Sequence, residues 1–538
     1  MPAPDQPLCH VFAGGFASDF GSIAYLAMRD GLFQIPFLTR AENCFFELNG
    51  SLRKVGGTSK YNETELESGE EIRGMFEYVR SGTSGSPTRR RVVHAGTKVL
   101  SDGNDGNFTD LITGLENDTV PNYTVFTDVL IIASDSTVDV PRKWDQTTVS
   151  LLGGSPPNFS FSCAHVNRLW AAGDHTHPSR LYYSAQLNPE DWSSSDAGHI
   201  DVEPDDGDRI TGIFAHRGVL FVFKGPNFGA IHVITGSTPS DFARRLFSSE
   251  LGGAGPNTIT SFGNDVAFVA LDGSIRSLAA TDKFGDFEEA ALSRGITTWI
   301  RSNVKVAGLK RAWARVDPTR GYVLFTLPVE SASRPDFVLC MDYRFSTADF
   351  GYGRMRFTTW PAFTAYSVAR MSDPSDSDRQ ILYLGGHDGF LRKTQQADRM
   401  IDGDSYDYRI KTPFFHYGTQ NRKKTISHFG LGIQSHGAAT VDFSIRGGPN
   451  VGATIEVEAI VGSTLGIGSP LPFVLGTSTL GGGDYFTFWG EVHDAGQFRE
   501  VSYELDAGEE NEDVEINSIH VVIETNTNPD YVNYETEF

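Results

Sequence analysis

The chain has 538 residues, and its 68 acidic side chains outnumber the 45 lysines and arginines, which gives a net charge of −23 with histidine neutral. This balance argues against tight binding to a phosphate backbone. No apolar run approaches the roughly 18–20 residues of a membrane span, and residues 1–7 lack the basic start and apolar middle of a signal peptide, so we expect folding in the cytoplasm.

Residues 1–40 are predicted to be an irregular N-terminal segment, in which only Ile23 to Leu32 is compatible with a helix. From residue 41 onward, short apolar runs end in Gly- or Asp-rich turns and return at a spacing of roughly fifty residues, as in repeat proteins. The clearest runs begin at Leu169, Val219 and Val266, and weaker ones begin at Cys44, Val92, Val129, Tyr322 and Ile381.

These repeats predict an all-β fold with a β-propeller over residues 41–400. Propeller repeats have periods of about 40–50 residues, and a single four-stranded blade cannot bury its own faces. We expect roughly six to eight blades. Continuous apolar runs in stacked sheets face a neighbouring blade, so the core should include Trp170, Leu220, Phe221, Phe223, Phe268 and Val269.

Turn signals between the apolar runs support the same fold. Asn-Gly or Asp-Gly pairs, which are typical of hairpin turns, begin at Asn49, Asp102, Asp105, Asp206, Asp272 and Asp388. One helix is predicted from Phe287 to Ile300, with Asp286 as its cap. Basic clusters at Arg89–Arg91 and Arg422–Lys424 precede strand-like segments and are interpreted as solvated strand edges or protein contacts.

Residues 401–538 are predicted to form a C-terminal β-sandwich-like domain. The segments Val441–Ile445, Thr454–Glu458 and Val514–Ile523 alternate polar and apolar residues with the period of a strand. A Gly/Ser-rich loop, Val461–Gly483, lies among them. Long loops without obvious structure are usually functional or mobile.

Two motifs in the middle of the chain carry residue types that could act on a ligand. Ser194–Gly198 has the Ser-x-Asp-x-Gly pattern of the sialidase Asp box, but it occurs once and lacks the closing aromatic residue. Asp174, His175 and His177 could ligate a metal, since His-x-His on a strand points both rings to one face. They precede Pro178, however, so a loop is the simpler interpretation.

Two acidic segments could likewise bind a ligand or act on one, but each also has a simpler structural interpretation. Asp102–Asn107 resembles part of a calcium loop, but the position that should hold a bidentate glutamate is Ile112. Asp205, Asp206 and Asp208 could serve a glycosidase as paired carboxylates. They also fit a hairpin loop with a glycine at its tip, and this is the interpretation we prefer.

The motifs therefore predict no catalytic residue, no cofactor-binding residue and no metal ligand, and the protein is predicted not to be an enzyme. The sequence contains no nucleophile elbow and no phosphate-binding loop. Neither a disulfide framework nor a metal site is indicated by the four cysteines, which are far apart: Cys9, Cys44, Cys163 and Cys340.

One stretch is more specific. Asn167–Asp174 runs into Pro178–Ser184, and Asn188–Trp192 follows, which predicts a strand, a tight loop, a second strand and a turn anchored by an aromatic side chain. This sequence resembles phage structural proteins with propeller folds, in particular the tail nozzle or hub proteins of short-tailed bacteriophages, also called packaged-DNA stabilisation proteins. Ile210–Gly225 and Leu251–Ile275 look like the segments that follow in that family.

The resemblance implies a structural virion protein that forms a ring homo-oligomer, usually a hexamer, in the virion tail. It would continue the DNA channel below the portal and adaptor, contact tail fibre or needle proteins, retain the packaged genome and pass it at ejection. Double-stranded DNA would slide through an acidic channel without specific binding. No insertion into a membrane is expected, and the Val461–Gly483 loop has no counterpart in the resemblance.

Two other functions stay open at this point. The chain could be a carbohydrate-active or receptor-binding propeller of a phage tail, or a monomeric scaffold in the cytoplasm. Oligomerisation separates the nozzle interpretation from both, and sugar binding or sugar turnover would mark the carbohydrate-active one.

Overall fold

A computed structural model describes residues 8–12, 15–19, 23–24, 27–29, 32–35, 37–81, 87–284, 291–346, 355–417, 423–435, 439–447, 454–461, 486–491, 498–507 and 513–525. The chain divides into two compact units. The propeller unit comprises Ser59–Arg344 and Phe363–Thr394. The sandwich unit comprises Met1–Thr58, Phe345–Ala362 and Gln395–Phe538.

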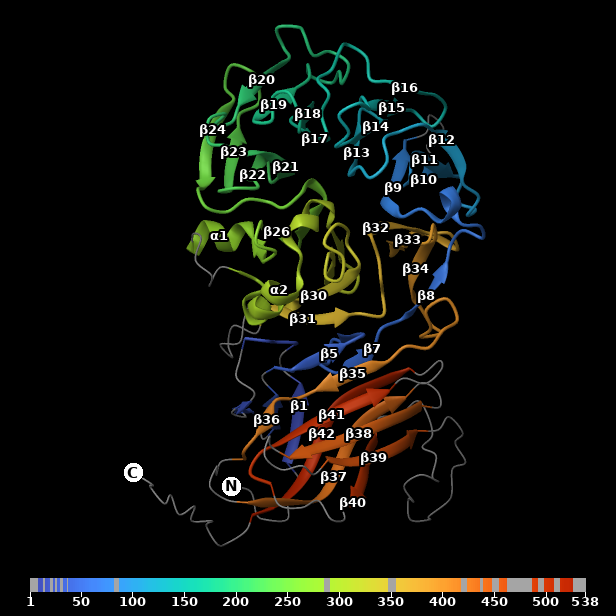
Figure 1. Cartoon of the computed structure of the whole chain (residues 1–538), viewed down its shortest axis with the longest axis vertical. Helices are drawn as coiled ribbons and strands as arrows, with labels where there is room; N and C mark the ends of the chain where they lie inside the picture. The colour runs from blue at the N-terminus through green and yellow to red at the C-terminus, as the bar shows by residue number, and fades with distance from the viewer. Residues whose placement is uncertain are drawn as a thin grey trace. The chain divides into compact units, whose positions relative to one another are not determined.

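The propeller unit is a ring of seven small antiparallel sheets, the blades (Figure 1). The first strand of each blade contacts the first strands of the blades on either side, and the last blade contacts the first. The ring is therefore closed, and the blade number falls within the predicted range. The predicted β-propeller is confirmed.

The first four blades have four strands each. The first consists of β9 (Ile72–Arg80), β10 (Thr88–Ala95), β11 (Lys98–Asp102) and β12 (Thr109–Ile112). The second consists of β13 (Pro121–Phe126), β14 (Val129–Ser134), β15 (Arg142–Trp144) and β16 (Val149–Leu151). The third consists of β17 (Phe161–His165), β18 (Arg168–Ala172), β19 (Arg180–Tyr183) and β20 (Gly198–Asp201). The fourth consists of β21 (Arg209–His216), β22 (Val219–Gly225), β23 (Ala230–Thr235) and β24 (Ala243–Ser248).

The last three blades are less regular. The fifth has β25 (Ile259–Phe262), β26 (Asp265–Val269) and β27 (Ile275–Ser277), after which helix α1 (Leu278–Phe284) follows directly. The sixth has β28 (Trp313–Asp317), β29 (Tyr322–Leu327) and β30 (Phe337–Ser346). The seventh has β32 (Ser367–Asp373), β33 (Asp376–Gly385) and β34 (Leu391–Gln396), and its fourth strand is β8 (Gly57–Lys60), from the start of the chain.

Short helices lie between the blades. They are η1 (Leu66–Gly69), η2 (Pro256–Thr258), η4 (Arg294–Ile296), α2 (Thr297–Asn303) and η5 (Val306–Arg311). Among the described residues, no helix is long and apolar enough to cross a bilayer. η1 leads into the first strand of the first blade and η2 into that of the fifth, while η4, α2 and η5 precede that of the sixth, so all five shape the same end of the ring.

The core of the ring lies where the apolar runs of neighbouring blades face each other. Phe223 of β22 is fully buried, and its ring centroid lies 5.2 Å from that of Phe268 in the fifth blade. β-Branched and aromatic side chains suit this half-buried pleated surface. All six side chains predicted for the core are buried, which confirms that prediction: Trp170, Leu220, Phe221, Phe223, Phe268 and Val269.

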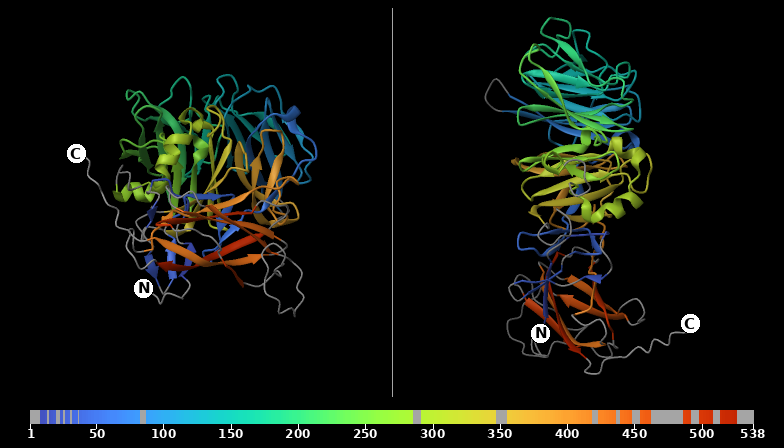
Figure 2. Two further views of the ribbon diagram at one scale, coloured as in Figure 1. Left: turned by 60° about the horizontal axis from the view of Figure 1, so that its bottom comes forward. Right: turned by 90° about the vertical axis from the view of Figure 1, so that its left-hand side faces the viewer.

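The sandwich unit has two sheets (Figure 2). One contains, in order, β3 (Ala27–Arg29), β4 (Leu32–Ile35), β1 (Leu8–Phe12), β42 (Val514–Thr525), β37 (Lys424–Ser435) and β40 (Phe486–Glu491), together with β6 (Cys44–Phe46) and β7 (Leu52–Lys54). The other contains β2 (Ile23–Ala24), β36 (Phe414–Phe415), β41 (Val501–Ala507), β35 (Tyr408–Lys411), β5 (Arg40–Glu42) and β31 (Met355–Trp360), with β38 (Ala439–Gly447) and β39 (Thr454–Val461).

The two sheets bury a common core. Phe429 of β37 stacks on Phe443 of β38, with ring centroids 4.9 Å apart, and both side chains are fully buried. Ile519 of β42 and Leu505 of β41 belong to the same cluster. This arrangement is the sandwich that the alternating strands predicted.

The N-terminal segment differs from the prediction. The predicted irregular segment 1–40 contains β1, which pairs with β42, and β4, which runs parallel to β1. The stretch from Ile23 to Leu32, compatible with a helix in the sequence, contains strands in its described part. β1 and its partner β42 lie about 500 residues apart along the chain, a separation that a local sequence pattern does not encode.

The division into domains also differs from the predicted boundaries of 1–40, 41–400 and 401–538. The propeller unit begins at Ser59, and the segment Phe345–Ala362 within the predicted propeller belongs to the sandwich unit. The first 58 residues join that unit as well. The sandwich is therefore built from three separate stretches of chain, and the propeller is inserted between them.

The predicted helix from Phe287 to Ile300 is correct only at its end, where Thr297–Ile300 begin helix α2. Residues 294–296 form the short turn η4, and helix α2 starts only at Thr297. Gly295 is buried inside η4. Glycine lowers the stability of an α-helix relative to most other residues, which disfavours a continuous helix through this position. The predicted cap Asp286 lies outside the described residues, as does the Val461–Gly483 loop apart from Val461 in β39.

Candidate functional site

One end of the ring carries a cavity of about 240 Å³ whose lining mixes apolar and charged residues. Strands alternate in direction within each blade, so the loops that precede every first strand lie at the same end as the loops between second and third strands. The cavity is lined by such loops from the second to the sixth blade. We call it the ring-end cavity, and its charged or ionisable lining residues are Asp135, Asp174, His175, Arg209 and Lys310.

Asp135 follows β14 and reaches across the ring. Its Oδ2 lies 3.1 Å from Nζ of Lys310, which precedes the sixth blade, and its Oδ1 accepts the backbone N–H of Val120 at 2.5 Å. The second and sixth blades are not neighbours, so this ion pair spans the end of the ring. It fixes one carboxylate and one ammonium group at the wall of the cavity.

Asp174 follows β18 in the third blade, and its side chain is only 9 % exposed. Its Oδ2 accepts a hydrogen bond from the Tyr182 hydroxyl at 2.7 Å and lies 3.2 Å from Nδ1 of His177, while Oδ1 accepts the N–H of Thr176 at 2.9 Å. Burial raises the pKa of Asp174, but these three donors outweigh burial and hold the pKa below its usual value. Asp174 is therefore an ionised carboxylate.

His175 and Arg209 complete the lining. Nε2 of His175 lies 3.1 Å from the backbone oxygen of Asp135, so this nitrogen carries the proton and donates it. Arg209 opens β21 and is exposed. Within the part of the chain that the structure describes, its guanidinium makes no ion pair.

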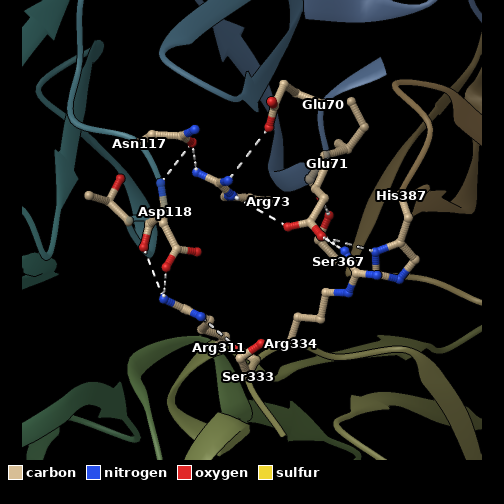
Figure 3. A network of polar contacts seen from close by, with 12 residues as sticks. Glu70, Glu71, Arg73, Asn117, Asp118, Arg311, Ser333, Arg334, Ser367 and His387 are labelled. Carbon is tan, nitrogen blue, oxygen red and sulfur yellow. Dashed lines mark hydrogen bonds and ion pairs between the residues drawn. The ribbon is translucent and has the colours of Figure 1, made fainter. Parts of the chain in front are cut away.

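A network of ion pairs continues from the cavity around the same end of the ring (Figure 3). Glu71 contacts Arg334, and its Oε1 lies 3.7 Å from Nδ1 of His387. Burial raises the pKa of Glu71, but hydrogen bonds and charges from His387 and Arg334 lower it to about 2. Arg73, only 5 % exposed, lies 3.8 Å from Glu71 and donates to Asn117.

The network joins the cavity through two consecutive residues. Lys310 contacts Asp135, and Arg311 donates to Asp118 Oδ2 at 2.6 Å and to the backbone oxygen of Ser333 at 2.6 Å (Figure 3). Carboxylates and cations alternate here, and each is held by a partner. The arrangement presents fixed donors and acceptors to a ligand, as recognition of hydroxyl groups requires.

Two residues singled out in the sequence lie in this cavity, namely Asp174 and His175. His177 lies outside the cavity lining, and its Nδ1 contacts Oδ2 of Asp174. Among the described residues, no cluster of three or more His, Cys, Asp or Glu side chains could hold a metal ion.

The acidic segment before β21 has a structural role. Asp206 is paired with the fully buried Lys224, its two carboxylate oxygens lying 2.7 and 2.6 Å from Nζ. Asp208 is buried and accepts three backbone N–H groups from residues 227–229. Gly207 stands between them with φ of +79°. The preferred hairpin-loop interpretation agrees with these contacts, and Asp205 is exposed.

The other two motifs also hold loops together. Asp196 of the Asp-box pattern contacts the buried Arg168 at 2.5 Å. Asp102 of the calcium-like segment accepts the N–H of Gly106 and contacts Tyr61. Both carboxylates are turned toward protein donors.

No local sequence pattern marks Asp135, Arg209 or Lys310 as site residues. Asp135 follows β14, Arg209 opens β21 and Lys310 lies in η5, and Asp135 and Lys310 are 175 positions apart. The signal that could have found them is positional, because each lies beside a strand at the same end of the predicted ring.

Comparison with known proteins gives fold neighbours only. No family model and no curated protein matches the chain. The chain is similar to an exo-β-1,3-galactanase from Phanerochaete chrysosporium solved with galactose, at 12 % identity and a TM-score of 0.25, covering 90 % of this chain and 99 % of that one. An ancestral enzyme of glycoside hydrolase family GH74 is similar at 9 % identity and a TM-score of 0.38, covering 69 % of this chain and 53 % of that one.

A second structure of the galactanase, a variant with β-1,3-galactotriose, matches at 10 % identity with the same coverage and a TM-score of 0.25. These three structures are of glycoside hydrolases, which contradicts the prediction that this protein is not an enzyme. TM-scores of 0.25 to 0.38 are too low to carry an argument about this chain, so its fold rests on its own strands and any activity has to be argued from the site itself.

Proposed function

We propose that the protein is a carbohydrate-active β-propeller and that the ring-end cavity binds one end of a glycan. The observation that carries this proposal is the set of Asp135, Asp174, His175 and Lys310 around one cavity. Sugar hydroxyls both donate and accept hydrogen bonds, so carboxylates beside N–H donors suit them. A volume of about 240 Å³ lies below the roughly 300–1,000 Å³ of pockets for drug-sized ligands and suits a single sugar ring.

Asp135 and Asp174 are the carboxylates that hydrolysis of a glycosidic bond would use. Such hydrolysis needs an ionised carboxylate beside the sugar ring and a second carboxyl group that transfers a proton. Asp174 suits the first role, because three donors hold it ionised. We assign the second role to Asp135, which takes up a proton from solvent when a sugar hydroxyl replaces its contact with Lys310 and passes that proton to the leaving glycosidic oxygen.

The test is a polysaccharide panel with two readouts, binding by titration calorimetry and release of reducing ends. Asp174→Asn and Asp135→Asn should each remove hydrolysis while thermal unfolding stays close to that of the wild type. Asp205→Asn is the matched control, because Asp205 is exposed and lies outside the cavity. The proposal fails if no polysaccharide is bound or cleaved, or if both cavity variants keep full activity.

A second proposal keeps the family resemblance, with six copies forming a tail nozzle ring that contacts portal, adaptor and fibre or needle proteins. It is supported by the segment Asn167–Trp192, whose residues build much of the third blade. Within it Trp170 is fully buried, and Arg168 is buried against Asp196. In this proposal DNA passes through the centre of the ring of copies.

The nozzle proposal is tested by the mass and location of the protein. The chain has a mass of 58.9 kDa, so an adaptor-bound ring should weigh several times that value. Immunogold labelling should place the protein at the virion tail. A single copy in the complex, or labelling of the capsid shell, would refute the assignment.

A further inference from the structure

Phe228 is the most exposed large apolar side chain on the described surface, at 75 %. It lies in the short loop between β22 and β23. An isolated exposed apolar side chain is ordinary on a protein surface. Phe228 differs because a buried carboxylate accepts hydrogen bonds from the backbone of its loop.

That carboxylate belongs to Asp208, which is 5 % exposed. Its Oδ1 accepts the N–H of Asn227 at 2.6 Å, and its Oδ2 accepts the N–H groups of Phe228 at 3.0 Å and Gly229 at 2.7 Å. Hydrogen bonds to an ionised acceptor are about twice as strong as neutral ones. The loop therefore presents the aromatic ring to solvent from a rigid support.

The same aspartate also places Arg209, the next residue in the chain. Arg209 lines the ring-end cavity and pairs with Gly225 in the sheet, two residues before Asn227. Its position beside the Phe228 loop follows from this register. The lining residues Asp135 and Lys310 already neutralise each other, and Asp174 is satisfied by its own three donors. Among the described residues the Arg209 guanidinium makes no ion pair, so its charge is available to a ligand.

We propose that Arg209 and Phe228 form a subsite at the mouth of the ring-end cavity that takes a carboxylate-bearing sugar, and that Asp208 positions both. This inference rests on the proposed glycan-binding function and adds the class of glycan, an acidic polysaccharide. The planar guanidinium matches a carboxylate with two parallel hydrogen bonds. The exposed aromatic face packs against the apolar face of a sugar ring.

A phosphodiester would offer the guanidinium a similar anion, so nucleic acid is the competing ligand. The net charge of −23 opposes any polyanion, an acidic polysaccharide as well as a nucleic acid, so it does not decide between them. A rigid aromatic ring beside a single arginine, in place of a basic stripe, favours a sugar chain over a phosphate backbone.

The experiment measures binding of polygalacturonate, hyaluronate and polysialic acid, each beside its carboxyl-reduced neutral form, and of a short DNA duplex. The variants are Arg209→Gln and Phe228→Ala. The matched controls are Arg245→Gln, on the exposed face of β24, and Leu187→Ala, an exposed apolar side chain at 62 % in another loop. All four positions are exposed, so every variant should fold.

The wild type should bind at least one acidic form about tenfold more tightly than its reduced form, which corresponds to about 1.4 kcal/mol. Arg209→Gln should remove this preference and leave binding of the neutral form unchanged. Phe228→Ala should weaken both forms by a similar factor, and the controls should match the wild type. Asp208→Asn should lose the preference as well, with faster amide exchange at Phe228 and Gly229.

The failures of the two proposals are distinguishable. If Asp174→Asn abolishes binding while Arg209→Gln and Phe228→Ala have no effect, the cavity binds glycan and the subsite is refuted. If the wild type binds none of the polysaccharides in either form, both proposals are refuted. Binding of the DNA duplex that is lost in Arg209→Gln, without glycan binding, would overturn the subsite in favour of nucleic acid.

Discussion

Asn257 donates a hydrogen bond from its side chain to the backbone oxygen of Pro121 at 2.9 Å, and this bond joins the fifth blade to the second across the ring. Near Pro121, a Cβ built on Gly74 of the first blade would lie 3.1 Å from the indole of Trp313 in the sixth. Blades that are not neighbours therefore meet at the ring axis. Side chains and backbone therefore fill the axis of the propeller at this level, and the charged residues of the ring-end cavity lie at one end of the ring.

Replacing Asn257 by alanine should lower stability. Asn257 is 4 % exposed, and its loss leaves the buried Pro121 oxygen without its donor. An unsatisfied buried polar group costs about 1–3 kcal/mol. Urea unfolding of Asn257→Ala measures this cost. Asn303→Ala, which removes a side-chain bond within one short helix, should have a smaller effect, and an equal effect would contradict the role assigned to Asn257.

Arg91 should be a strong determinant of ring closure between the first and seventh blades. Its guanidinium lies 4.5 Å from the ring centroid of Tyr61 and 5.4 Å from that of Tyr383, and it donates to the oxygen of Ser372 at 2.7 Å. Its ion-pair partner Asp102 has a fully buried side chain.

Arg91→Met keeps the volume but leaves Asp102 as a buried charge, and removal of one partner of a buried pair costs about 3–5 kcal/mol. Differential scanning calorimetry should show a large fall in the unfolding temperature. The double variant Arg91→Met/Asp102→Leu should regain part of it, while Arg90→Met should be close to neutral. No recovery in the double variant would show that the cation–aromatic packing dominates.

Phe223→Ala tests the core between the fourth and fifth blades. The side chain is fully buried against Phe268, and a large-to-small change of this kind costs about 3–5 kcal/mol. Phe228→Ala is the matched control, since that ring is 75 % exposed. Equilibrium unfolding in urea compares the two. A loss below about 1 kcal/mol for Phe223→Ala lies outside the range for core positions and would rule out the packing described.

Acid should weaken the ring through Glu71. Its pKa is about 2 in the folded protein and about 4.3 in the unfolded chain. The unfolded chain therefore binds the proton first as the pH falls. The stabilisation is complete above about pH 4.5 and is lost progressively toward pH 2, with a total of about 3 kcal/mol.

Glu71→Gln should accordingly be less stable than the wild type at pH 7 and should approach it as the pH falls to 3. The measurement is urea unfolding at several pH values. Glu63→Gln, an exposed neighbour in the same loop region, should keep the wild-type dependence. Parallel curves for Glu71→Gln and the wild type would show that Glu71 does not titrate as described.

The propeller fold was predictable because most of its strands pair with the next strand along the chain, so that each blade is encoded by one short segment. Runs such as Val219–Gly225 are apolar and end at a turn, and each pairs with the next run along the chain. The sandwich was predictable only in part. Its alternating strands were recognisable, but the pairing of β1 with β42 joins segments more than 500 residues apart, and no local pattern encodes such a partner.

The site was less predictable than the fold. Asp174 and His175 stood out by residue type, whereas Arg209 and Lys310 gained their meaning only from the loops that the ring brings together. The burial of charged side chains was equally hard to predict from the sequence. The Arg89–Arg91 cluster was interpreted as a solvated strand edge or a protein contact, and the solvated edge is wrong for Arg91, which is 1 % exposed. A cation between two tyrosines cannot be told from a surface cation by its neighbours in sequence.

The position of β1 and β8 at the start of the chain has a consequence for biosynthesis. β8 cannot pair until β34 has been synthesised, and β1 cannot pair until β42 has been synthesised. At about 5–20 residues per second on the ribosome, the delay for β1 is roughly half a minute or longer. During that time the nascent chain exposes unpaired strand edges, which invite association with other chains. Slower translation or the loss of a holding chaperone should therefore lower the yield of soluble protein, while protein that has finished folding is unaffected.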